Sequence, residues 1–217
     1  MTDREKIRAA EEFLLRRLRG GAYMQAHPDE LAYRIEHSYR VANLGAEIAA
    51  CEGFDVTEMT AACLLHDVAY CEEFDPERGW REHGRRSARI ARPFLESLGF
   101  APERVADMCY GIAIHVDDRA DFDGVRTPFA ETVSDADNLD RFDAYRIYET
   151  LQRQGFDTLP LEEKRAHAEK TLTSLARLRD MKMATPTAAA LWRERLDLYT
   201  AFYGRLRAQI ENSAAIR

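Results

Sequence analysis

The sequence predicts an all-α protein, because three observations agree. Apolar residues recur at steps of three and four along most of the chain, and no stretch of useful length alternates apolar and polar residues as a half-buried strand would. Pro102, Pro128 and Pro186 each stand where such a periodic segment begins, a position that suits proline in a helix. The 217 residues suffice for one well-buried core, so we predict a single compact multi-helix domain over residues 1–217.

Composition narrows the class of protein. The formal net charge of -7 and the pI near 5.5 disfavour a general nucleic-acid binder and a protein of anionic membrane surfaces. No apolar run approaches the roughly 20 residues that cross a bilayer, and residues 1–5 lack the apolar core of a secretion signal, so we expect a cytoplasmic protein. The four cysteines show no Cys-x-x-Cys spacing, so we expect reduced thiols.

The first part of the chain predicts three helices, two of which turn a histidine inward. Thr2-x-x-Glu5 resembles a capping box that opens the first helix. The second covers about residues 29–52, and its apolar face comprises His37, Val41, Leu44 and Ile48. The third begins near Thr57, and its core-facing stripe comprises Met59, Ala62, Cys63, His66 and Tyr70. Asp67 then lies about 100° further round that helix.

Three later helices also carry polar side chains on their apolar faces. A pattern over about residues 80–98 aligns His83, Ser87, Ile90 and Phe94, although Pro93 predicts a kink or break just before it. The helix that Pro102 opens aligns Val105, Cys109, Ile112 and His115. In the helix that Pro128 opens, steps of four connect Phe129, Val133 and Asp137. A buried aspartate needs a partner, because an unpaired buried carboxylate is costly.

The remaining chain reads as supporting helices over about residues 146–212. We expect segments that reach residue 154, cover residues 161–183 and cover residues 185–211. The last of them has an apolar stripe of Leu191, Leu198, Phe202, Leu206 and Ile210. We assign no role to His167, which lies in a charged stretch.

Six inward polar residues come from five predicted helices: His37, His66, Asp67, His83, His115 and Asp137. Taken singly, a histidine on an apolar face is more often a hydrogen-bonded core residue than a ligand. A shared metal site explains all six together, because imidazole nitrogen and carboxylate oxygen are good donors to divalent first-row metals. The set would suffice for two ions roughly 3.5 to 4 Å apart, with Asp67 bridging them.

This ordered pattern resembles the HD-domain superfamily of metal-dependent phosphohydrolases over about residues 30–145. The resemblance implies an all-helical fold in which His37 is the first ligand, His66-Asp67 the His-Asp pair, and His83 and His115 two additional ligands. Asp135 competes with Asp137 for the closing aspartate. The Ala-Asp-x-Leu step favours Asp137, which also continues the apolar stripe of its helix.

The resemblance further implies an enzyme that hydrolyses a phosphate ester of a nucleotide or another small phosphorylated metabolite with a metal-activated water. Asp67 and His66 would be its catalytic residues, and its cofactors two divalent ions of Mn, Fe, Co, Ni or Zn. Two alternatives stay open at this point. Some HD-domain proteins are di-iron oxygenases with the same ligands, and a helical domain could bind metal only for stability.

One departure from the family pattern concerns phosphate binding. Many members carry a lysine in His-Asp-x-Gly-Lys, where it can meet a phosphate, whereas this chain reads His66-Asp67-Val68-Ala69-Tyr70. That contact must be absent or replaced. Guanidinium groups suit phosphate oxygens, and four arginines lie near His83: Arg78, Arg81, Arg85 and Arg86. The alternative is that these arginines form a solvated face.

Overall fold

The computed structural model describes residues 1–75 and 79–213, and these residues form helices and turns without a strand. The all-α prediction is therefore confirmed. The chain divides into two compact units, Met1–Asp140 and Arg141–Arg217. That residues 1–217 form a single domain stays a prediction. Within the described residues, no helix is both long enough and apolar enough to cross a membrane.

The first unit holds the elements that surround the predicted metal site. It comprises α1 (Asp3–Gly20), α2 (Ala22–Ala26), α3 (Pro28–Glu52), α4 (Val56–Leu65), the 3-10 turns η1 (Val68–Cys71) and η2 (Gly79–Glu82), α5 (His83–Ser97), α6 (Pro102–Ile114) and α7 (Pro128–Asp140).

Local capping chemistry sets the helix ends that the sequence predicted. Thr2 and Glu5 form a capping box, in which the Thr2 hydroxyl accepts from the Glu5 N–H and the Glu5 carboxylate accepts from the Thr2 N–H. Gly53 ends α3 with a φ of 74°, a left-handed conformation that glycine adopts without strain. Asp55 then caps α4 by accepting from the Glu58 N–H.

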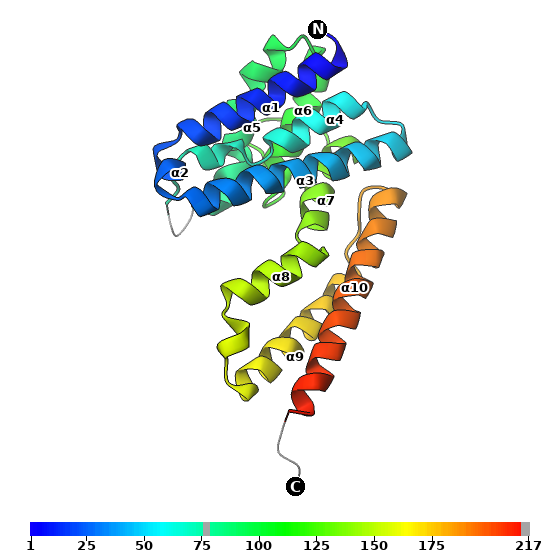
Figure 1. The fold of residues 1–217 in the computed structure, drawn as a ribbon. Coiled ribbons are helices and arrows are strands. Elements are labelled where there is room, and N and C mark those ends of the chain that lie inside the picture. The colour runs from blue at the N-terminus through cyan, green and yellow to red at the C-terminus, as the bar shows by residue number, and fades with distance from the viewer. Residues whose placement is uncertain (76–78, 214–217) are drawn as a thin grey trace. The chain divides into compact units, whose positions relative to one another are not determined.

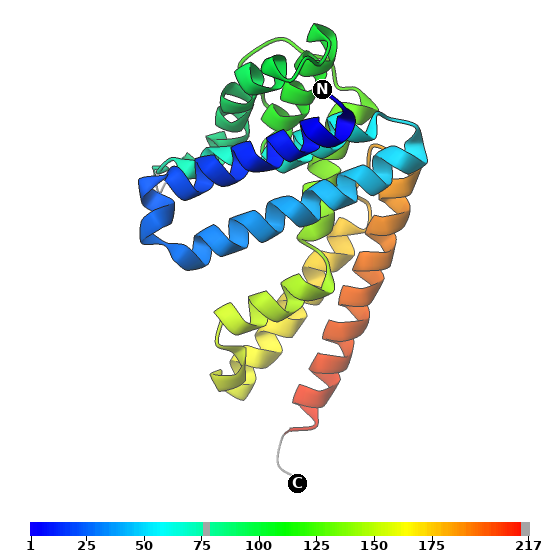
Figure 2. The same cartoon turned by 45° about the horizontal axis from the view of Figure 1, so that its top comes forward.

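Helix α4 is the centre of this unit. It packs against α1, α3, α6 and α7, and both views show α1 and α3 running alongside it (Figures 1 and 2). Residues 61–65 of α4 are all buried. These five residues are all apolar, and a helical segment that is apolar all round must lie inside a core.

The end of α4 differs from the prediction. The helix stops at Leu65, so Tyr70 belongs to η1 and does not continue the stripe. Asp67 leaves the helical conformation, with φ −107° and ψ 13°. The last carbonyls of a helix lack backbone partners, and here the Cys63 carbonyl accepts from Nδ1 of His66 at 2.7 Å.

Helix α5 also differs from the prediction. It begins at His83, after η2, and continues through Pro93 without the predicted break. An interior proline lacks one backbone N–H and its ring crowds the carbonyl four residues earlier, but the packing of this helix on the core through Ala88, Ala91 and Leu95 holds its turns together.

A close approach between helices brings the start of α5 against the end of α6. A Cβ atom on Gly84 would lie 2.7 Å from the Ala113 carbonyl oxygen and 3.2 Å from Nδ1 of His115. Only glycine therefore fits at this contact. Because Gly84 follows His83 directly, the same contact brings His83 beside His115.

The second unit comprises α8 (Ala144–Arg153), the 3-10 turn η3 (Phe156–Thr158), α9 (Leu161–Leu178) and α10 (Pro186–Glu211), with α10 packed on α9 and α8. Helix α9 ends before the predicted residue 183. Nε1 of Trp192 donates to the Leu178 carbonyl at this end, at 3.1 Å.

The predicted apolar stripe of α10 is wrong. Leu198 and Phe202 are 43% and 38% exposed, and Leu191 and Leu206 are only half-buried, although Ile210 is buried. The buried face instead comprises Trp192, Leu196, Tyr199 and Tyr203. Both stripes have helical spacing, and burying the larger aromatic rings removes more apolar area from water.

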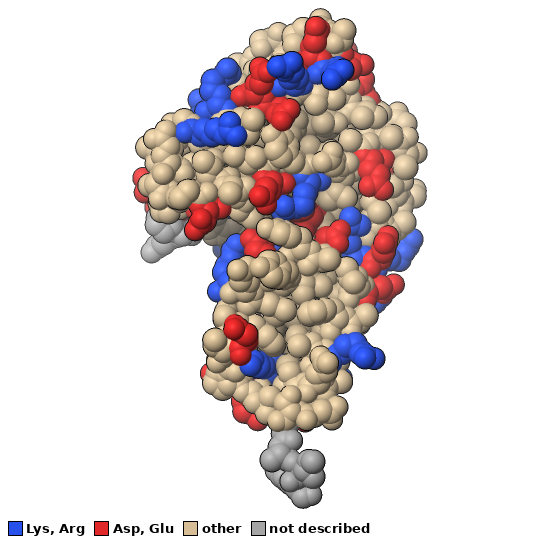
Figure 3. All heavy atoms as spheres, viewed as in Figure 1, with Lys and Arg blue, Asp and Glu red and all other residues tan. Residues whose placement is uncertain are grey.

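Charged side chains of both signs lie on the surface of the protein. Acidic and basic side chains lie interspersed on the face drawn in Figure 3.

We predict that Gly84→Ala lowers the free energy of unfolding by about 1 to 3 kcal/mol, because the new methyl group overpacks a backbone contact. Gly204→Ala is the matched control, since a Cβ there meets nothing within 4 Å. It should leave stability unchanged or raise it by up to about 1 kcal/mol. Urea unfolding measures both variants, and a Gly84→Ala variant as stable as the parent would contradict the packing argument.

Candidate metal centre

All six predicted site residues lie in one buried cluster of the first unit. His37 comes from α3, His66 and Asp67 follow α4, and His83 begins α5. The last two residues are His115, directly after α6, and Asp137 in α7. None of the six is more than 9% exposed. That they bind metal stays a prediction.

The Nε2 atoms of the histidines face one another in two pairs. His37 and His66 have their Nε2 atoms 3.2 Å apart, and His83 and His115 have theirs 3.1 Å apart. Asp67 lies between the pairs, with Oδ2 3.6 Å from Nε2 of both His37 and His66. Its Oδ1 lies 3.1 Å from Nε2 of His83 and 3.6 Å from Nε2 of His115. Asp137 Oδ1 lies 3.2 Å from Nε2 of His37.

The other ring nitrogens fix the tautomers of these histidines. Nδ1 of His66 and Nδ1 of His115 each lie 2.7 Å from a backbone carbonyl, of Cys63 and Ile112 respectively. Nδ1 of His83 contacts the Trp80 carbonyl in the same way. A carbonyl only accepts, so Nδ1 must carry the hydrogen. In the neutral ring, Nε2 is then left with a lone pair directed into the cluster.

Facing lone pairs at hydrogen-bond distance require a positive charge between them, either a proton or a metal cation. Burial lowers the pKa of His66 to about 4, so this ring resists protonation. Burial also opposes the charged form of His37, but the carboxylates of Asp137 and Asp140 outweigh it and raise its pKa to about 9. The cluster therefore favours a cation at the Nε2 atoms.

Asp67 supplies an unsatisfied acceptor to the same cluster. Its Oδ1 is buried and has no hydrogen-bond partner among the described residues, although Nε2 of His83 lies 3.1 Å away. Burial opposes ionisation, yet the imidazoles of His66 and His83 hold the pKa of this carboxyl well below its usual range. A buried ionised oxygen without a donor is costly unless a cation binds it.

These atoms form two overlapping groups that fit a divalent ion. One ligand atom from each of His37, His66 and Asp67 lies within 4.8 Å of the others, and the same holds for Asp67, His83 and His115. Asp67 belongs to both groups. The donors are imidazole nitrogens and carboxylate oxygens, which suit first-row transition metals, and carbonyls orient the rings from behind.

Two residues of this centre were missed at the sequence level. Asp140 accepts from Nδ1 of His37 at 2.7 Å and from Nε of Arg40 at 2.5 Å. Arg34 donates from Nη1 to Oδ2 of Asp67 at 2.9 Å. The signal was present in the spacing, because Arg34 lies three residues before His37 and Asp140 three residues after Asp137, which places each on the ligand face of its helix.

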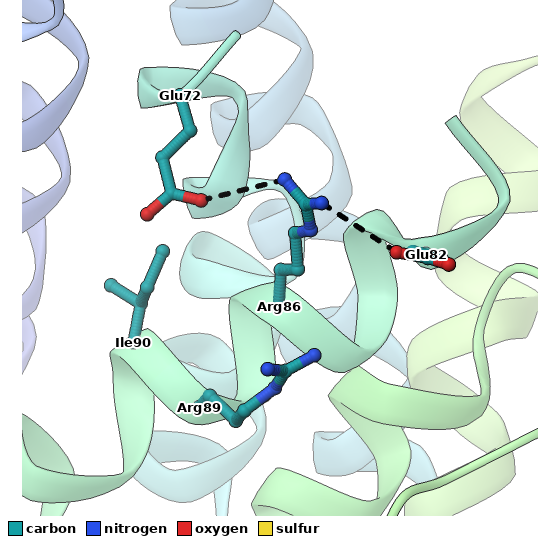
Figure 4. Close-up of a pocket in the computed structure, with 5 residues that line it drawn as sticks. All are labelled: Glu72, Glu82, Arg86, Arg89 and Ile90. Atoms are coloured by element: carbon teal, nitrogen blue, oxygen red, sulfur yellow. Dashed lines mark ion pairs between the residues drawn. The ribbon is translucent and has the colours of Figure 1, made fainter. Parts of the chain in front are cut away.

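Two of the arginines predicted near the site, Arg85 and Arg86, contact acidic side chains. Arg85 donates to both carboxylate oxygens of Asp117, at 2.7 and 2.8 Å. Arg86 lies between Glu72 and Glu82 at the edge of a surface pocket lined by Glu72, Glu82, Arg86, Arg89 and Ile90 (Figure 4). Arg81 lies over the ring of Trp80. Arg78 lies outside the described residues. That these arginines bind phosphate stays a prediction.

The fold and the cluster together define an α-helical protein with a candidate metal centre. Residues 34–141 match the family model of the HD domain, and this span includes all six residues of the cluster. The chain therefore belongs to the HD-domain superfamily, and the resemblance inferred from the sequence is confirmed.

Two solved structures have the same fold. One is Bacillus subtilis YpgQ in complex with ADP, at 23% identity and a TM-score of 0.65, with 96% of this chain and 97% of that chain covered. The other is a predicted HD superfamily hydrolase from an uncultured Thermotogales bacterium, at 21% identity and a TM-score of 0.60, with 95% and 91% covered. Among curated proteins no sequence matches significantly.

We predict that Asp140→Asn weakens Mn²⁺ binding by about 10- to 100-fold, because a neutral amide holds the His37 ring less strongly than a carboxylate does. Isothermal titration calorimetry measures the affinity. Glu58→Gln is the matched control. Glu58 is also a buried acid, but it lies outside the cluster and accepts from Nε of Arg104 at 2.7 Å. Equal Mn²⁺ affinities in the two variants would show that Asp140 does not support the centre.

Proposed function

We propose that this protein is a metal-dependent phosphohydrolase that cleaves a phosphate ester of a nucleotide or another small phosphorylated metabolite. The observation that carries the proposal is the convergence of four histidine Nε2 atoms on Asp67, whose buried Oδ1 has no hydrogen-bond partner among the described residues. Membership of the HD-domain superfamily supports it. The ADP bound to YpgQ favours a nucleotide within this substrate class.

Each residue has a definite task in this proposal. His37, His66, Asp67 and Asp137 would hold one ion, while His83, His115 and the second oxygen of Asp67 would hold another. Bound divalent ions supply an acidified water and a Lewis acid for the phosphoryl oxygens. Asp140 and the three carbonyls behind the rings keep the Nε2 lone pairs directed inward. Asp67 and His66 are the residues that we propose as catalytic.

Imidazole-rich ligand sets favour Mn, Fe, Co, Ni or Zn over Mg²⁺ or Ca²⁺, which prefer oxygen. An HD-type di-iron oxygenase would require iron in a redox-active form, so its activity would fail with Mn²⁺ or Co²⁺. A domain that uses metal only for stability would lose thermal stability on chelation and would turn over no phosphate ester.

The first test is a screen of nucleotides and small phosphate esters against protein reconstituted with Mn²⁺ or Co²⁺. We predict phosphate or pyrophosphate release by the parent protein and none by Asp67→Ala, with the helical circular dichroism retained. Glu58→Gln should keep its activity, because this acid lies outside the cluster. Full metal loading without turnover of any ester would reject the phosphohydrolase.

The second test concerns the number of ions. We predict that His83→Ala combined with His115→Ala lowers bound metal from about two ions to about one per chain. The turnover number should fall at least about 100-fold, which corresponds to a loss of roughly 3 kcal/mol of transition-state stabilisation. Elemental analysis counts the ions.

The control for this test is His167→Ala, which removes a half-buried histidine of the second unit. It should change neither the metal content nor the turnover. If the double variant also keeps both at the parent level, His83 and His115 are hydrogen-bonded core residues and not ligands.

A further inference from the structure

Arg34 combines burial beside the candidate metal centre with unused hydrogen-bond donors. Its side chain is 17% exposed, and Nη1 donates to Oδ2 of Asp67 at 2.9 Å. A guanidinium carries five N–H donors. Among the residues that the structure describes, Nε of Arg34 is buried and has no hydrogen-bond partner, and the acid nearest Nη2 is Glu30 at 3.9 Å, beyond hydrogen-bond range.

The other arginines around the site differ from Arg34 in this respect. Arg85 gives both of its contacts to Asp117, and Arg86 is shared by Glu72 and Glu82. Glu30, the acid closest to Nη2 of Arg34, already accepts from the Tyr23 hydroxyl at 3.0 Å. Unlike Arg85 and Arg86, Arg34 therefore keeps hydrogen-bond donors that no acidic side chain among the described residues accepts.

Aromatic rings hold this guanidinium in place. It lies 3.3 Å from the centroid of the Tyr70 ring and 5.4 Å from that of Tyr33. Stacking on a ring restrains the plane of the guanidinium, whose N–H groups all lie at its edge, and leaves those of Nη2 available to an anion. Tyr70 stands at the position where many family members carry a lysine. Because the guanidinium of Arg34 lies on the Tyr70 ring, a positive charge is still present at this position.

We propose that Arg34 binds a phosphoryl oxygen of the substrate through its free donors while Nη1 remains on Asp67. The proposal rests on the proposed phosphohydrolase function and adds the residue that recognises the phosphoryl group. Charge-assisted hydrogen bonds from arginine to phosphate are strong, and a partly buried arginine forms them with little competition from water. Arg34 would thus connect the phosphoryl group to the carboxylate that both ligand groups share.

The test measures binding of inorganic phosphate to Mn²⁺-loaded protein by isothermal titration calorimetry. We expect Arg34→Gln to keep its Mn²⁺ content and to weaken phosphate binding at least about tenfold. Arg34→Lys should fall between this variant and the parent, because lysine keeps the charge but loses the planar fork. Tyr70→Phe should bind phosphate like the parent, since the ring remains.

Arg104→Gln is the matched control. Arg104 is also a partly buried arginine with two acidic partners, Glu58 at 2.7 Å and Asp107 at 2.9 Å, but it lies outside the cluster. This variant should bind phosphate like the parent, so any loss of affinity in it would measure a general effect of removing such a charge.

Three results would overturn the proposal. Phosphate affinity within twofold of the parent in fully loaded Arg34→Gln would exclude Arg34 from phosphate binding, and the same affinity in fully loaded Arg34→Met would do so if the first variant did not fold. Loss of Mn²⁺ from Arg34→Gln would mean that Arg34 acts only by holding Asp67. If the loaded parent bound no phosphate, this inference would fail, whereas the proposed function would fail only if the loaded parent also turned over no ester.

Discussion

The structure depends on one constraint, which is that imidazole nitrogens with lone pairs face one another in a buried space. The rings cannot turn away, because each Nδ1 is committed to an acceptor: Cys63, Trp80 and Ile112 supply carbonyls, and Asp140 supplies a carboxylate. Two of these carbonyls stand in the last turns of α4 and α6, where backbone acceptors lack helical partners. The carbonyls at these helix ends therefore also orient the histidines of the candidate centre. A cation bound at the Nε2 atoms would satisfy the other side of each ring.

The packing of the first unit serves this arrangement. Helix α4 lies at the centre of the unit and carries His66 at its end, so the helices that cover it converge on the same point. Gly84 lets α5 approach the end of α6 closely enough for His83 to face His115. Arg34 and Arg40 extend the network outward, each as the partner of a carboxylate in the cluster. The acidic and basic side chains of the centre therefore come from several helices, and no single helix carries the whole centre.

Sequence reasoning reached the fold and the six clustered residues because both depend on local periodicity. It missed what depends on distant partners. Arg34 and Asp67 are 33 residues apart in sequence, and His37 and Asp140 are 103 apart, so no local pattern pairs them. The arginines after His83 looked free because Asp117, which binds Arg85, belongs to a loop after another helix. The stripe of α10 was misjudged because leucine spacing alone does not reveal that the aromatic face is buried.

Anomalous diffraction from crystals grown with Mn²⁺ would locate the ions in the cluster without relying on turnover. We expect two anomalous peaks roughly 3.5 to 4 Å apart, one beside the Nε2 atoms of His37 and His66 and one beside those of His83 and His115, with Asp67 contacting both. A single peak beside His37 and His66 would restrict the centre to one ion. The absence of any peak in the cluster, with the facing imidazoles unchanged, would contradict the proposed metal centre.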